Sequence, residues 1–160
     1  MVPDRCDCFR RDGELTIIID EIRKFIKEEC PLIKGKRSLK LNCLEEKAPA
    51  MTIEQVPCNP IIKKYTDGGS QRQVVFVLAS REEYDVELWK QVEAANFFEQ
   101  LQDWFESASN EKHLPQLANG LTAQRIEVTS CAYKLTNSQT TARYQIQCKL
   151  IYYKEGVKVL

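Results

Sequence analysis

Residue types that commonly perform catalysis are few and scattered in this chain. His113 is the single histidine, and it lies in a polar segment just before Leu114 and Pro115. Catalysis by a Ser-His-Asp or Cys-His arrangement would need this residue, and no GxSxG motif accompanies it. A lone histidine in such a segment is usually a solvated surface residue. We therefore predict no catalytic residue and a function that is not enzymatic.

Cysteine spacing gives no support for a metal site. Cys6 and Cys8 are the only tight pair among the seven cysteines. Zinc sites usually combine a CxxC or longer spacing with a second pair elsewhere. We predict no metal and no cofactor, and we expect free thiols in a reducing compartment.

Other polar motifs are also better explained by ordinary structure. Gly68-Gly69 lacks the GxxxxGK[ST] or GxGxxG context of a phosphate-binding loop and predicts a turn. The glutamate pairs at 45–46 and 82–83 are typical of solvated faces. A basic cluster could contact phosphate, although such runs are usually wet strand ends; it consists of Lys34, Lys36, Arg37 and Lys40.

Two segments carry apolar residues at helical spacing. Residues 14–30 repeat apolar positions every three or four residues, and Pro31 would end a helix there. Residues 92–108 carry a wider and more aromatic face, which predicts a second helix and the largest contribution to the core. The residues of this face are Val92, Ala95, Phe98, Leu101, Phe105 and Ala108.

Several segments have the composition or alternation of strands. Residues 39–43 and 50–58 alternate, and residues 61–66 predict a short extended piece before the Asp67-Gly68-Gly69 turn. Residues 72–80 are apolar and rich in β-branched side chains, which predicts a central strand covered on both faces. Residues 123–135 and 140–154 predict a C-terminal β-hairpin.

The last predicted strand is about twice the usual length. Even-numbered residues from Ala142 to Tyr152 are largely apolar, whereas the odd-numbered residues from Arg143 to Lys149 are polar. Ile151 and Tyr153 add apolar area to the polar side. We expect the end of this strand, residues 150–153, to extend beyond its helix and to need cover from another subunit. Alternatively, residues 154–160 fold back over it.

The order of helix, two strands, short extended piece, strand, helix and two strands predicts an α+β fold. In this α/β sandwich, two helices cover a mostly antiparallel sheet that ends in a long hairpin. A length of 160 residues favours one domain, 1–160, with residues 1–12 as a polar N-terminal extension. No apolar run reaches the roughly 20 residues needed to cross a bilayer, so we expect a cytosolic location and no membrane partner.

A family resemblance emerges from four segments taken together. They are KKYTDGGSQRQVVFVLASREEYD, NFFEQLQDWFES, LPQLANGLTAQRIEVTS and TARYQIQCKLIYYK. Their order and spacing resemble the small minor capsid or tail-completion proteins of tailed phages and prophages of Gram-positive bacteria, in particular the tail terminator group. The resemblance covers residues 60–154 and rests on layout, whereas residues 1–60 match in element order alone.

This resemblance implies a structural virion protein of the tail or neck, assembled in the bacterial host cytoplasm. Terminators of this kind form a ring homo-oligomer, commonly a hexamer, on the end of the tail tube. The ring ends tube polymerisation, contacts the tail tube protein and the head-tail connector protein, and leaves a channel through which DNA passes transiently. Equal counts of 23 basic and 23 acidic residues suit a conduit that should not retain DNA.

A ring of identical subunits needs a heterologous interface, in which one patch meets a different one. We predict one side at the end of the hairpin and the other beside the Gly-Gly turn. The residues are Ile151, Tyr152 and Tyr153 for the first side, and Lys64, Tyr65 and Asp67 for the second. Tyr65 has an equally simple alternative, in which it packs on its own strand.

Three other functions remain open at this point. A head-tail adaptor would bind the capsid connector in place of tube protein, and the sequence does not separate it from a terminator. A small enzyme would require polar residues converging between the sheet and the helix around residues 97–105. A nucleic-acid-binding module would use the basic cluster at residues 34–40 and would bind duplexes with a steep salt dependence.

Overall fold

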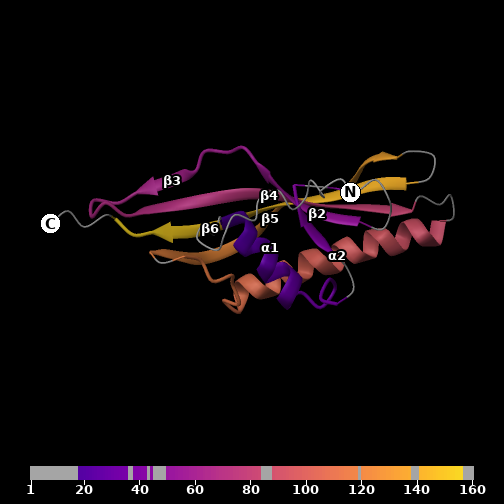
Figure 1. The fold of residues 1–160 in the computed structure, drawn as a ribbon, viewed down its shortest axis with the longest axis horizontal. Coiled ribbons are helices and arrows are strands. Elements are labelled where there is room, and N and C mark those ends of the chain that lie inside the picture. The colour runs from indigo at the N-terminus through magenta and orange to yellow at the C-terminus, as the bar shows by residue number, and fades with distance from the viewer. Residues whose placement is uncertain are drawn as a thin grey trace, which may run out of the picture.

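The structure is a computed structural model, and it describes residues 18–35, 38–42, 44, 50–83, 88–118, 120–137 and 141–156. The predictions for residues 1–12, Cys6, Cys8, Lys36 and Arg37 lie outside these residues. The elements are α1 (Ile18–Glu29), β1 (Leu39–Leu41), β2 (Ala50–Val56), β3 (Ile61–Lys64), β4 (Ser70–Glu83), α2 (Leu88–Asn110), β5 (Leu121–Asn137) and β6 (Thr141–Lys154). Figure 1 shows them in an elongated arrangement.

Helix α1 follows directly from its apolar spacing. Ile19, Ile22, Phe25 and Ile26 are buried, and they recur at the three- and four-residue steps that place side chains on one side of a helix. Acidic residues stand in the first turn and Lys27 in the last, where each complements the helix dipole. The helix ends at Glu29, before the proline that was predicted to stop it.

The strands form one six-stranded, mostly antiparallel sheet in the order β1-β2-β4-β6-β5. β1 and β2 are parallel, and the other pairs are antiparallel. β4 pairs with β6 along its whole length, while its other edge is shared by β3 near residues 70–72 and β2 at residues 75–81. The predicted α+β fold, the sequence order of the elements and the β5–β6 hairpin are confirmed.

The prediction that the end of β6 overhangs as an uncovered edge is wrong. β6 lies inside the sheet, and Lys154 is still paired with Ser70 of β4 and with Leu121 of β5. Ile151 is 1% exposed and Tyr152 6%. The physical reason is length, because β4 and β5 span 14 and 17 residues and therefore match a long central strand on both sides.

Both helices contribute to the core on one face of the sheet. Phe76 and Leu78 of β4 lie beside Cys148 and Ile146 of β6 on this face, and all four are fully buried. Phe105 of α2 completes this part of the core with its ring centroid 6.4 Å from that of Phe76 in an edge-on arrangement. In Figure 1, α2 runs along the lower side of the strands with α1 beside it.

The opposite face of the sheet combines buried apolar residues with paired charges. Val75, Val77 and Ala79 of β4 are all less than 10% exposed, which confirms the prediction of a central strand buried on both faces. Around them, three ion pairs bridge neighbouring residues or strands. They are Arg143–Glu54 at 2.9 Å, Lys149–Glu127 at 3.3 Å and Arg125–Glu127 at 2.6 Å. These pairs join three cations on this face to two carboxylates, because Glu127 is shared by two of them.

Candidate assembly surfaces

The tip of the β3–β4 hairpin packs against the end of β6. The rings of Tyr65 and Tyr153 lie 6.0 Å apart between centroids, and Tyr153 also covers Gly69. The pairing of Gln71 with Tyr153 in the β4–β6 register brings these residues together. The two groups predicted to form opposite sides of a ring interface thus meet within one chain. We name this cluster the tyrosine end.

The turn at the tyrosine end is held by Asp67 and Gly68. The Asp67 Oδ1 atom accepts a hydrogen bond from the Gly69 amide at 2.8 Å, and Gly68 has a φ of 89°, which is costly for other residues. Partial burial raises the pKa of the Tyr153 phenol, and the negative charges of Asp67 and Glu155 act in the same direction. The turn at residues 67–69 and the end of β6 therefore interact through Asp67 and Tyr153.

Substituting Gly69 by alanine is expected to destabilise the tyrosine end. A Cβ atom at this position would overlap the Tyr153 ring, whose Cζ atom would lie only 2.8 Å away. Moving the ring costs packing, and we expect a loss of about 1–3 kcal/mol in the free energy of unfolding. Urea denaturation followed by circular dichroism measures this loss. In a Tyr153→Ala background, Gly69→Ala should cost clearly less, and an unchanged cost would contradict the proposed overlap.

The six residues predicted for subunit contact have different environments. Lys64, Tyr65 and Asp67 are exposed, whereas Ile151 and Tyr152 are buried in the sheet and Tyr153 is half-buried against Tyr65. The structure therefore leaves the first three accessible to another molecule. The role of all six in a subunit contact stays a prediction.

Exposed apolar residues gather on β3 and directly after it. Ile62 is 45% exposed and Tyr65 38%, and the Lys63 ammonium lies 5.4 Å from the centroid of the Tyr65 ring. Lys64 is exposed as well, so the strip combines two apolar side chains with two cations. We call Ile62, Lys63, Lys64 and Tyr65 the β3 patch. The sequence analysis did not identify Ile62 and Lys63 as contact residues. The pattern that could have indicated them is an apolar residue next to a basic one in a short outer strand.

A second exposed surface occupies the first half of α2. Its apolar face was predicted to be buried from residue 92 onward, and this is wrong for Val92 and Ala95. Both are exposed, Val92 by 56%, whereas Phe98 and Leu101 further along are buried. The reason is geometric, because the early turns of α2 extend to the end of the molecule that lies away from the tyrosine end (Figure 1).

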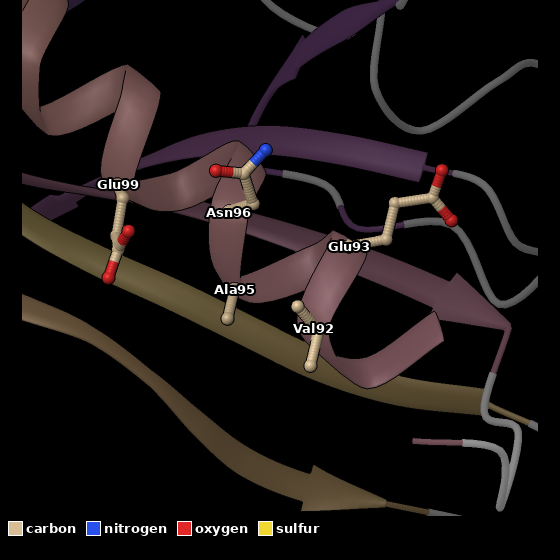
Figure 2. A pocket seen from close by; sticks show the side chains of 5 residues that line it. All are labelled: Val92, Glu93, Ala95, Asn96 and Glu99. Carbon is tan, nitrogen blue, oxygen red and sulfur yellow. The ribbon is translucent and has the colours of Figure 1, made fainter. Parts of the chain in front are cut away.

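A shallow hollow of about 510 Å³ lies along these early turns, and we call its lining residues the α2 patch. They are Val92, Glu93, Ala95, Asn96 and Glu99. Figure 2 shows Val92, Ala95 and Glu99 following one another along one side of the helix. Neither glutamate forms an ion pair with any residue within the described ranges. The α2 patch is thus apolar and acidic.

The residues first considered for catalysis lie elsewhere. His113 Nε2 lies 3.1 Å from Glu29 Oε2, and its ring is 5.4 Å from that of Phe25, so this residue links the end of α2 to α1. Its side chain is 53% exposed, as predicted for a surface histidine. Among the described residues there is no cluster of three metal-binding side chains, and no helix is both long and apolar enough to span a bilayer.

The comparisons with known proteins give no family assignment. No model of a known protein family matches the chain, and no curated protein sequence matches it. The resemblance to tail terminators therefore remains a prediction that rests on the order and spacing of the segments.

Proposed function

We propose that this chain is a structural subunit of a phage or phage-tail-like particle. It forms a ring on the end of the tail tube, ends polymerisation of the tube protein and joins the tail to the head. A head-tail adaptor, which binds the head-side connector in place of the tube, is the alternative within the same class.

The observation that supports this proposal most is the position of the exposed apolar residues. In the described part of the chain the large exposed hydrophobic side chains are Ile62, Tyr65 and Val92. They lie on the β3 and α2 patches, towards opposite ends of the long axis in Figure 1. Single exposed apolar residues are common, but their combination with charges at two ends suits a subunit that repeats.

The sheet face opposite the helices is compatible with a DNA conduit. On this face the cations Arg143 and Lys149 are paired with Glu54 and Glu127. A surface that retains DNA carries an excess of cations that displace counterions from the phosphates. Cations that are already paired with carboxylates would let the DNA pass without binding it tightly.

A tube-capping experiment tests the proposed function. The purified chain is added to tube protein of the same particle during polymerisation, and the tubes are examined by electron microscopy. We expect added density at one end and shorter tubes than without the chain. Unchanged tube lengths with bare ends would contradict the terminator function. Binding to purified head-side connector in a pull-down, without binding to tubes, would identify the adaptor instead.

A further inference from the structure

We propose that copies of this chain bind head to tail, with the β3 patch of one copy docked on the α2 patch of the next. This inference rests on the proposed function and deepens it by naming the two surfaces that meet. The partner is thus a second copy of this chain.

The two patches complement each other in apolar character. Ile62 on β3 and Tyr65 directly after it are exposed, and Val92 and Ala95 line a hollow on a helix. Removing such side chains from water stabilises a contact by roughly 25 cal/mol per Å² of apolar surface. Each patch is small, so a second source of specificity is needed for one particular partner.

Charge supplies this specificity. Lys63 and Lys64 are the charged residues of the β3 patch, and Glu93 and Glu99 are those of the α2 patch. Residues 91–110 of α2 include no basic residue, and they carry two further acidic residues, Asp103 and Glu106. Asp67 and Glu155, whose negative charges act on Tyr153, lie near the β3 patch and offset part of its positive charge. Opposite fields of this kind steer association and exclude wrong orientations.

The positions of the patches determine the type of assembly. They lie towards opposite ends of the long axis (Figure 1), so one copy cannot satisfy its own patches with each other. A contact between two different patches is heterologous, and each bound copy leaves one patch free for the next. Copies therefore add one after another until a ring closes, and if the geometry does not close a ring they form a filament.

Charge reversal with mixing tests this contact. We expect Lys63→Glu/Lys64→Glu and Glu93→Lys/Glu99→Lys each to weaken self-association by about 10- to 100-fold, because like charges then face each other. An equimolar mixture of the two variants should assemble again, since every contact between unlike copies pairs opposite charges. Light scattering coupled to size-exclusion chromatography measures all three samples and the wild-type chain.

Matched controls carry the same charge changes at exposed sites outside the patches. Lys27→Glu/Lys34→Glu and Asp103→Lys/Glu111→Lys should assemble like the wild-type chain. Circular dichroism checks that every variant keeps the wild-type fold, which is expected because all substituted side chains are exposed.

Three outcomes would overturn the inference. The first is a wild-type chain that is monomeric at the highest concentration measured. The second is assembly that survives in both charge-reversal variants. The third is an equimolar mixture of the two variants that fails to assemble. Tube capping separates this inference from the proposed function. Head-to-tail assembly without tube binding would contradict the function alone, whereas capping by variants with reversed patches would contradict the inference alone.

Discussion

Replacing Phe105 by alanine is expected to lower the free energy of unfolding by about 3–5 kcal/mol. Phe105 is fully buried, and its ring contacts both Phe76 at 6.4 Å and Trp104 at 5.2 Å between centroids. The substitution leaves a cavity between α2 and the centre of the sheet. Since natural domains are stable by about 5–15 kcal/mol, the variant loses a large share of its stability. Urea denaturation followed by far-ultraviolet circular dichroism measures the difference.

The control for this prediction is Val92→Ala on the same helix. Val92 is 56% exposed, so its truncation creates no cavity. We expect a change within about 0.5 kcal/mol, because alanine also favours the helix slightly over valine. Equal losses for the two variants would mean that the first half of α2 is buried in solution, which would contradict the exposed α2 patch.

Cys148 is expected to resist alkylation in the folded chain, whereas Cys58 reacts readily. Cys148 is fully buried on the helix-covered face, and burial raises the pKa of its thiol far above the ordinary value. Cys58 is exposed. The thiolate is the reactive form of cysteine. Iodoacetamide at pH 8 should therefore modify Cys148 at least on the order of 100-fold more slowly than Cys58. Mass spectrometry of the two tryptic peptides gives both rates.

Denaturation provides the control for the cysteine prediction. In guanidinium chloride both thiols are exposed, and their alkylation rates should become similar.

The raised pKa of the Cys148 thiol also has a consequence for stability. Above about pH 8.5 the unfolded chain releases the Cys148 proton while the folded chain retains it, so the free energy of unfolding should fall as pH rises. Fast labelling of Cys148 in the native chain would show that the sheet opens there.

Local periodicity accounts for the parts of the fold that were predicted correctly. The alternation from Ala142 to Tyr152 identified both β6 and the side that faces the helices, because side chains alternate strictly along a strand. The β-branched run at residues 72–80 identified a strand covered on both faces, and helical spacing identified Phe98, Leu101 and Phe105 as core residues. Each of these signals lies within a single segment.

The features that were missed depend on the relative placement of distant segments. Periodicity shows which side of α2 is apolar, but it does not show how far along the helix other segments cover that side, and Val92 is left exposed. The lateral order of strands is likewise absent from any one strand. The contact between Tyr65 and Tyr153 follows from the register of β4 on β6, which pairs residues far apart in sequence.

The central position of β6 has a consequence for how the chain acquires its structure. β6 separates β4 from β5, yet it follows both of them in sequence. During synthesis, β4 therefore leaves the ribosome with one long edge unpaired and must wait for a partner encoded much later. Pairings of such high sequence separation form slowly and leave nascent chains prone to aggregation. A chain halted before Thr141 would lack the strand that joins its two halves, and chaperone dependence should be greatest at that stage.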